Sequence, residues 1–375
     1  MSNTKMIAIA VVAIIAVAAV VAVATIDDDD NGSITIVDGK GTTITLDGPV
    51  DGVVICNTNI PKAMKILGYE EKVKGISFYS DSTDDQNWNI FSPLFPDAKH
   101  MSITTTITGE EIISKAGVKY VIAPVSSMTV SESQETSFNI NGITVIRLDC
   151  NGDSAFDDFE KLIKIFDGNK TNQDYEDYKS IYNGVVNTVL GKVAQAPSTA
   201  GMTFLSYMES KDTFYNQTSA ISAEIEKVFG KNATRSLTGL DLSGVTNDAT
   251  QDGIREAVIA LDGSDSIDKI FVRGSTKTTT ESKALELWNK CTVAKKYSAL
   301  SAIAAGEVYV LNSDIMSGPL SYIGFVYYAE ICGVDTGYNA TQLATEYNEM
   351  YGFNENTTGF AFKIANGTAT EIVVN

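Results

Sequence analysis

Cationic and aromatic side chains at the ends of expected strands are the residues of this 375-residue chain best suited to bind a ligand. Arginine is scarce, with four in the chain, and Arg273 directly follows the apolar pair Phe271-Val272. A planar guanidinium suits carboxylate or phosphate groups, because it donates two parallel hydrogen bonds. We therefore predict that Arg273 contacts a ligand, and a structural salt bridge remains the alternative.

Aromatic residues also lie on the segments that follow expected strands. Their flat, amphipathic rings suit a ligand with a flat or aromatic face. For each ring, a place at the edge of the core is the alternative. The candidates are Tyr79, Trp88, Tyr207, Tyr215 and Tyr322.

Groups for catalysis are poorly represented. The single histidine, His100, lies in a polar stretch, so a multi-histidine zinc site cannot be assembled. As an axial ligand of a bound haem it would be notable, but an ordinary surface histidine is the simpler interpretation. The chain lacks a Gly-X-Ser-X-Gly nucleophile motif, a phosphate-binding loop and a Cys-X-X-Cys pair. We predict a non-enzymatic protein with no catalytic residue, no metal site of its own and no resident cofactor.

Composition and charge narrow the class of protein further. A hydrophobic share of 44% and a charged share of 20% are typical of a folded globular protein. The net charge of -19 gives an anionic surface, which argues against a nucleic-acid binder. The length is sufficient for two domains of ordinary size.

The N-terminal segment predicts export. Met6 to Ile26 is almost wholly apolar and, at about 21 residues, is long enough to cross a membrane. Lys5 precedes it and an acidic spacer, residues 27–32, follows, which favours an anchor with the N-terminus inside and the rest outside. The alternative is that residues 1–26 are a signal peptide, which is cleaved near Ala24.

In an exported chain, disulfides and N-glycans are permitted. The four cysteines fall two in each half, which favours the pairs Cys56–Cys150 and Cys291–Cys332 over the other connectivities. Buried free thiols are the alternative. Seven Asn-X-Ser/Thr sequons begin at Asn31, Asn169, Asn216, Asn232, Asn339, Asn356 and Asn366.

One long amphipathic helix organises the expected fold. Over residues 171–197, apolar residues recur at the helical spacing, from Tyr175 and Tyr178 to Val193, and Pro197 ends the pattern. On each side, short apolar strands alternate with amphipathic helices, which is typical of mainly parallel sheets. We predict two α/β lobes, residues 33–170 and 198–375, joined by this helix. A single α/β domain is the alternative.

Ligands of parallel α/β sheets bind outside the carboxyl ends of the strands. The loops expected there are 56–61, 78–81, 124–128, 208–215, 273–277 and 313–322, and two facing lobes would place them around one cleft. Asn57, Ser126 and Ser317 lie on these loops and join Arg273 and the aromatic residues as predicted ligand contacts.

Several stretches, in this order, resemble the substrate-binding proteins of ABC importers for iron-siderophores, haem and cobalamin, the class with one helical crossover. Residues 36–46 resemble the opening hairpin of that family, and residues 53–56 with 66–77 resemble its first strand–helix–strand unit. Residues 305–311 with 317–321 resemble its late strand and pocket loop. The resemblance runs from about Ile34 to Gly352.

The resemblance implies a monomeric two-lobed clamp that captures an iron- or cobalt-containing chelate and hands it to an ABC permease with its ATPase. Family members dock through a surface glutamate on each lobe, and the matching positions here are Glu110, with Glu111 as a neighbour, and Glu256. The connecting helix implies small motions on binding. Sequons, acidity and the missing lipid-attachment cysteine would suit an archaeal envelope.

This chain departs from the family pattern in the opening hairpin, where Lys40-Gly41 replaces an arginine, at Gly52, and beside Gly318-Pro319, where no arginine occurs. Because of these departures, the resemblance does not identify the ligand. A cell-envelope surface protein that keeps the fold without chelate uptake is therefore the alternative function.

Overall fold

The computed structural model describes residues 32–78, 86–126, 129–168, 170–196, 201–208, 213–215, 219–237, 248–275, 278–354 and 356–374. The predicted anchor or signal segment, Met6–Ile26, lies outside this part of the chain. Within the described ranges, no helix is both long and apolar enough to span a bilayer. Residues 34–375 form one compact unit.

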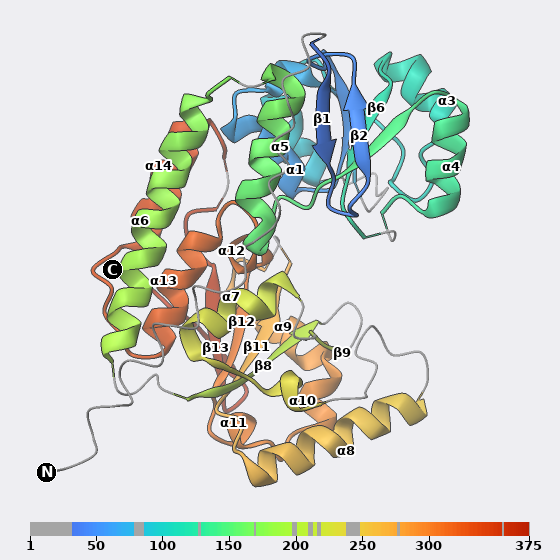
Figure 1. Ribbon diagram of the computed structural model, residues 1–375. Coiled ribbons are helices and arrows are strands. Elements are labelled where there is room, and N and C mark those ends of the chain that lie inside the picture. The colour runs from blue at the N-terminus through green and yellow to red at the C-terminus, as the bar shows by residue number, and fades with distance from the viewer. Residues whose placement is uncertain are drawn as a thin grey trace, which may run out of the picture. The chain divides into compact units, whose positions relative to one another are not determined.

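The N-terminal half contains a hairpin and a parallel sheet (Figure 1). Strands β1 (Ile34–Val37) and β2 (Thr43–Leu46) pair antiparallel, as the sequence predicts. The sheet has the order β5-β4-β3-β6-β7 and is parallel throughout. Its strands are short and rich in Val and Ile because helices cover both faces. They are β3 (Val53–Cys56), β4 (Val73–Ser77), β5 (Lys99–His100), β6 (Tyr120–Ala123) and β7 (Thr144–Arg147).

Helices connect these strands. They are α1 (Asn59–Ile66), α2 (Gln86–Phe91), α3 (Gly109–Glu111) with a π-helical turn over Ile112–Ala116, α4 (Glu132–Ile140) and α5 (Ala155–Asp167). The polar stretch between Tyr79 and Met101 contains α2 and β5. Helix α4 was not expected, because Phe138 is its one buried residue and gives no apolar period.

The long connecting helix is confirmed as α6 (Gln173–Gln195, 23 residues). Asn172 caps it, since its side-chain oxygen accepts a hydrogen bond from the Tyr175 N–H at 2.9 Å. The buried face carries the predicted stripe of Tyr175, Tyr178, Val185, Val186, Val189 and Val193.

The C-terminal half has a seven-stranded sheet of order β10-β8-β11-β12-β13-β14, with β9 paired to β8. Strands β10, β8, β11 and β12 are parallel, and β9, β13 and β14 are antiparallel to their neighbours. The strands are β8 (Thr203–Met208), β9 (Thr213–Phe214), β10 (Lys231–Asn232), β11 (Lys269–Arg273), β12 (Val308–Leu311), β13 (Ala361–Ala365) and β14 (Thr368–Glu371).

The helices of this half are α7 (Ala220–Phe229), α8 (Asp248–Ser264), α9 (Glu281–Lys290), α10 (Thr292–Lys296), α11 (Ser301–Ala304), α12 (Ser313–Met316), α13 (Ser321–Ile331) and α14 (Ala340–Tyr351). Helices α9 and α10 are separated by Cys291, which is extended at φ -63°, ψ 132°. The loop predicted after β12 contains α12.

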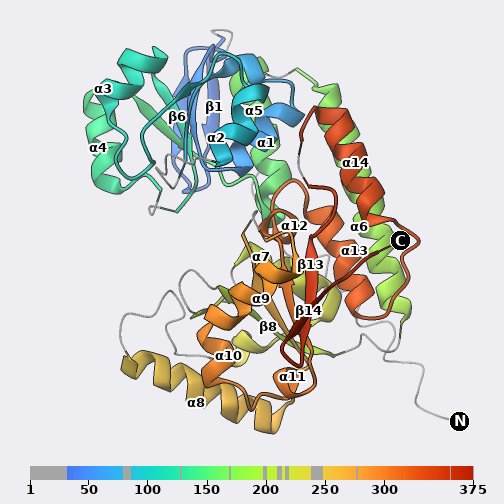
Figure 2. The same ribbon diagram turned by 180° about the vertical axis from the view of Figure 1, so that it is seen from behind.

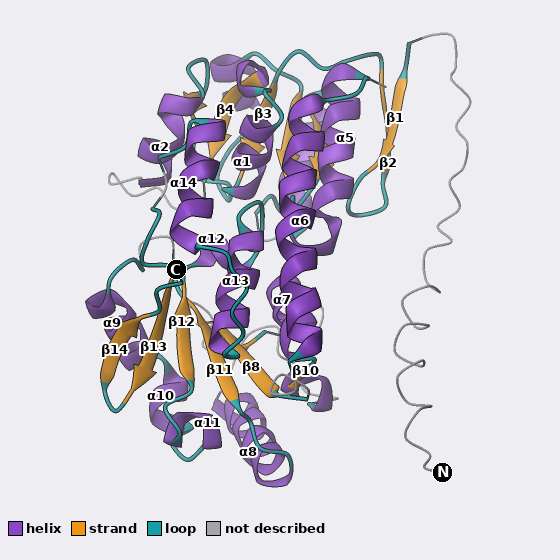
Figure 3. Cartoon of the chain, turned by 90° about the vertical axis from the view of Figure 1, so that its left-hand side faces the viewer, coloured by secondary structure: helices purple, strands orange, loops and turns teal. Residues whose placement is uncertain are grey.

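Helix α13 packs along α6, and α14 packs against α13 (Figures 2 and 3). The Tyr351 ring of α14 lies 6.4 Å from that of Tyr178, and a Cβ placed at Gly352 would lie 3.9 Å from Lys65 of α1. One cluster of buried apolar residues runs from Ile34 to Val374 through these helices. The end of the chain thus contacts the N-terminal half, and a close-packed core connects both sheets.

The predicted disulfides are wrong, because all four cysteines are free and buried. Cys56 ends β3 and Cys150 follows β7, and β6 lies between those strands. Two strand spacings are about 10 Å, which is beyond the reach of a disulfide. Cys291 and Cys332 belong to different core clusters.

The described sequons differ in accessibility. Asn232 is 2% exposed, and its side-chain oxygen accepts hydrogen bonds from Thr234, so this site cannot carry a glycan in the folded protein. Asn356 and Asn366 are exposed, and glycosylation there stays a prediction. Those beginning at Asn31, Asn169 and Asn216 lie outside the described residues.

Candidate functional site

The predicted ligand residues that the structure describes lie mostly at the carboxyl edges of the two parallel sheets. Asn57 follows β3, Ser126 follows β6, Arg273 ends β11, and Ser317 follows β12 through α12. This is the edge at which parallel α/β sheets bind their ligands.

The loop after β3 is shaped by Asn57. Its φ is +88°, in the left-handed region that asparagine tolerates better than most residues. Its side-chain oxygen accepts hydrogen bonds from the N–H groups of Asn59 and Ile60, at 2.8 and 3.2 Å. Asn57, which is 8% exposed, thus caps the first turn of α1 and positions that helix.

Loops from the two sheets meet at the start of α1. Lys62 of α1 and Asp314 of α12 form an ion pair of 3.0 Å, in which the Lys62 side chain is 5% exposed. Gly318 has φ +86°, and a Cβ there would lie 2.8 Å from the side-chain oxygen of Asn59. Only glycine fits so close an approach with that backbone conformation. The predicted loops 56–61 and 313–322 therefore lie against each other in the structure.

Arg273 and Tyr215 form the clearest pair among the predicted residues. Strand β9 folds back on β8, with Phe214 opposite Tyr207, and the Tyr215 N–H donates to the Ser206 carbonyl at 2.8 Å. The guanidinium of Arg273 lies close enough to the Tyr215 phenol to act on its ionisation. Burial raises the pKa of Tyr215, and the charge of Arg273 opposes that rise. Arg273 itself is exposed, so further guanidinium N–H groups can reach a ligand.

Two of the predicted aromatic contacts belong to the core instead. Tyr207 is 1% exposed and packs edge-on against Phe214, with ring centroids 5.4 Å apart. Tyr322 is 3% exposed and lies 5.9 Å from the ring of Tyr182. Neither ring offers a face to a ligand in this structure. The physical reason is that β8 and α13 are covered on all sides, a property of tertiary packing.

The remaining predicted contacts have mixed surroundings. Trp88 of α2 is partly buried and lies 5.0 Å, centroid to centroid, from the imidazole of His100 on β5. Ser126 is exposed and Ser317 is partly exposed. Tyr79 lies outside the described residues. In the described ranges, no three His, Cys, Asp or Glu residues are grouped so as to hold a metal ion.

The predicted docking glutamates are both on the surface. Thr108 caps α3, and Glu110 is exposed, as is Glu256 on α8. Glu111 is engaged within the molecule: burial raises its pKa, but hydrogen bonds from Lys115 and Ser102 lower the pKa below its ordinary value. Glu110 is therefore the better docking candidate of the two neighbours.

A cavity of about 560 Å³ lies elsewhere, at the amino ends of β3, β4 and β6. Its lining includes Asp51, Lys74 and Tyr120. This edge of the sheet is opposite the one that carries Asn57 and Ser126. The cavity is therefore separate from the predicted ligand site.

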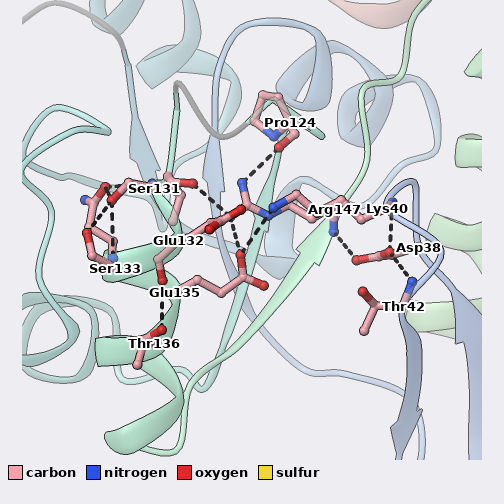
Figure 4. A network of polar contacts seen from close by, with 12 residues as sticks. Asp38, Lys40, Thr42, Pro124, Ser131, Glu132, Ser133, Glu135, Thr136 and Arg147 are labelled. Atoms are coloured by element: carbon pink, nitrogen blue, oxygen red, sulfur yellow. Dashed lines mark hydrogen bonds and ion pairs between the residues drawn. The ribbon is translucent and has the colours of Figure 1, made fainter.

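Sequence reasoning did not single out Arg147. This residue ends β7, at the same sheet edge as Ser126, and its side chain is fully buried. The signal was available, since Arg147 follows Val145-Ile146 as Arg273 follows Phe271-Val272. Figure 4 shows the network around it.

Comparison with known proteins gives a fold and no sequence relative. No family model matches the chain, and no curated protein matches it. Among solved structures, the TroA-like periplasmic binding protein FepB from Veillonella parvula is 16% identical, with a TM-score of 0.59 over 91% of this chain and 100% of that chain.

Two further structures agree. CeuE from Helicobacter pylori with Ni(II) bound is 14% identical, with a TM-score of 0.57 over 86% of this chain and 98% of that one. A periplasmic haem-binding protein from Pseudomonas aeruginosa is 12% identical, with a TM-score of 0.56 over 84% and 98%. The chain has the two-lobed TroA-like fold of these proteins, which confirms the fold implied by the resemblance.

Proposed function

We propose that the chain is an extracytoplasmic substrate-binding protein of an ABC importer, which captures a metal chelate and delivers it to a membrane permease. The solved structures of this fold include proteins named for haem binding and one with Ni(II) bound. A protein that binds and releases its cargo needs no catalytic constellation, and the sequence offers none.

The observation that carries the proposal is the pair of Arg273 and Tyr215 at the carboxyl edge of the C-terminal sheet. An exposed guanidinium beside a phenol presents a cation and a hydrogen-bonding ring edge to an anionic, aromatic chelate. Gly274 donates its N–H to the Leu311 carbonyl at 2.6 Å, which ties the end of β11 to the segment leading to Ser317. We propose Arg273, Tyr215, Ser317, Ser126 and Trp88 as ligand contacts.

Delivery would use Glu110 and Glu256, one in each half of the chain. Both are exposed, on α3 and α8. Carboxylates at such positions can steer an encounter with cationic groups of a permease and fix its orientation. The N-terminal segment Met6–Ile26 would keep the protein at the membrane.

The test is the melting temperature of the protein, from Asp27 onward, with ferric hydroxamates, ferric catecholates, haem, cobalamin and cobinamide. A ligand at about 100 times its dissociation constant adds about 2.7 kcal/mol of stability. We expect a rise with one chelate class. Arg273→Gln should abolish this rise in melting temperature. Arg273→Lys should retain part of it, because lysine keeps the positive charge but lacks the two parallel N–H donors of the guanidinium. A well-folded protein that responds to none would favour the surface-protein alternative.

A further inference from the structure

Arg147 is a fully buried cation at the carboxyl edge of the N-terminal sheet. A buried guanidinium is costly unless its N–H groups are hydrogen-bonded, because water no longer solvates the charge. The partners of Arg147 therefore show what the residue holds.

Its side chain binds both ends of one loop. One terminal nitrogen donates to the Pro124 carbonyl at 3.0 Å, and the other donates to the Val130 carbonyl at 2.8 Å (Figure 4). The second nitrogen also contacts Glu135 of α4 at 2.5 Å. The segment between the two carbonyls includes Ser126, one of the proposed ligand contacts.

Its backbone binds the hairpin turn between β1 and β2. The Arg147 N–H donates to the Asp38 carboxylate at 3.3 Å, and the Gly39 N–H donates to the Arg147 carbonyl at 2.7 Å. A Cβ at Gly39 would lie 2.4 Å from a methyl carbon of Val125, so the turn lies directly against the loop. One residue thus joins the turn, the loop, β7 and α4.

The charges around Arg147 are balanced on the solvent side. Glu135 neutralises it and also lies 3.8 Å from the Lys40 ammonium, and both of these side chains are a little under one third exposed. Among the described residues, the buried Arg147 Nε atom has no hydrogen-bond partner. A side chain without access to solvent does not touch a ligand, and apart from the ion pair with Glu135 the contacts of Arg147 fix backbone geometry.

We propose that Arg147 is a positioning residue, which holds the two described ends of the loop after β6, residues 124–126 and 129–130, against the hairpin turn so that the N-terminal wall of the ligand site is formed before the ligand arrives. The role in ligand binding rests on the proposed function. The clamp itself does not, because it is a property of the unliganded protein.

The test is amide hydrogen exchange of the full chain without ligand in the variants Arg147→Met and Arg147→Lys, with Arg273→Met, at an exposed strand-end arginine, as the matched control. Hydrogen bonds to a charged group contribute enough that losing both carbonyl contacts should speed local exchange by about tenfold or more. We expect this in Arg147→Met for peptides spanning 121–135 and 38–42. Exchange in β8 and β12 should not change. Arg147→Lys should be intermediate, since an ammonium cannot span both carbonyls, and Arg273→Met should leave exchange in these peptides unchanged.

Ligand binding supplies the second measurement. For any chelate that stabilises the wild-type protein, Arg147→Met should weaken binding about tenfold or more while the protein remains folded, and Arg147→Lys should recover part of the affinity. Equal acceleration of exchange in both halves, or none near the loop, would overturn the clamp. If Arg147→Met does not fold, the local pattern in Arg147→Lys decides. A confirmed exchange pattern with no chelate bound would instead count against the proposed function alone.

Discussion

Arg147 and Arg273 have the same sequence setting and opposite surroundings. Each follows two apolar residues at the end of a parallel strand, β7 or β11. Arg147 is fully buried and binds two backbone carbonyls and a carboxylate. Arg273 is exposed, and its charge acts on one phenol, that of Tyr215. A strand-end position therefore predicts the edge of the sheet, but not whether the side chain serves the fold or a ligand.

The difference arises from what covers each strand end. At the end of β7, the guanidinium donates to the carbonyls of Pro124 and Val130, and the hairpin turn at Gly39 binds the Arg147 backbone. At the end of β11, the Gly274 N–H still donates to the Leu311 carbonyl of β12, and the group that acts on Arg273 is the phenol of Tyr215. Arg273 therefore remains exposed to solvent.

The largest expected effect compares the stability of Arg147→Ala with that of Arg273→Ala. Removing Arg147 leaves Glu135 and two buried carbonyls without their donor, which should cost about 3 kcal/mol. Arg273→Ala should change the free energy of unfolding by about 0.5 kcal/mol, because exposed substitutions usually do little. Urea unfolding of both variants measures the difference. Equal losses would contradict the assignment of structural and ligand roles.

The sequence predicted the elements with a clear apolar period and missed those without one. Helix α6 and the strand Val308–Leu311 were predicted because their buried residues repeat regularly. Helix α4 was missed because one residue, Phe138, is buried. The predicted pair Cys56–Cys150 was wrong because β6 lies between β3 and β7 in the sheet. The spacing of cysteines along the chain does not reveal this strand order.

The candidate site was predictable to the level of the sheet edge. Rules for parallel sheets located Arg273 and Ser126 there. The pairing of Arg273 with Tyr215 depends on β9 folding back on β8, and the burial of Tyr207 and Tyr322 depends on tertiary packing. Such long-range contacts leave no periodic signal in one sequence.

A smaller effect is expected in the titration of Tyr215. Burial holds its pKa above the ordinary value, and Arg273 limits that rise. Arg273→Gln should therefore raise the pKa further, and Arg273→Lys should raise it less, because a charge remains. The difference in tyrosinate absorbance between each variant and its Tyr215→Phe counterpart isolates this residue. An unchanged titration in Arg273→Gln would show that the pair does not form in solution.

The smallest effect is expected at Glu307, a carboxylate that contacts two cations as Glu135 does. At the opposite edge of the C-terminal sheet, Glu307 binds Lys269 at 2.6 Å and Lys363 at 2.5 Å. Burial raises its pKa, but the hydrogen bonds from both lysines and Tyr309 prevail and lower the pKa to about 2.

A pKa lowered on folding from 4.5 to about 2 means that Glu307 stabilises the protein above pH 4.5 and loses this contribution as the pH falls toward 2. The site is partly exposed and screened by water, so the contribution should stay below about 1 kcal/mol. Unfolding free energies of wild type and Glu307→Gln should differ at pH 6 and converge near pH 2. If wild type and Glu307→Gln still differ in unfolding free energy at low pH, the effect comes from packing and not from the charge of Glu307. Arg147 and Glu307 would then differ in their burial and not in the strength of their ion pairs.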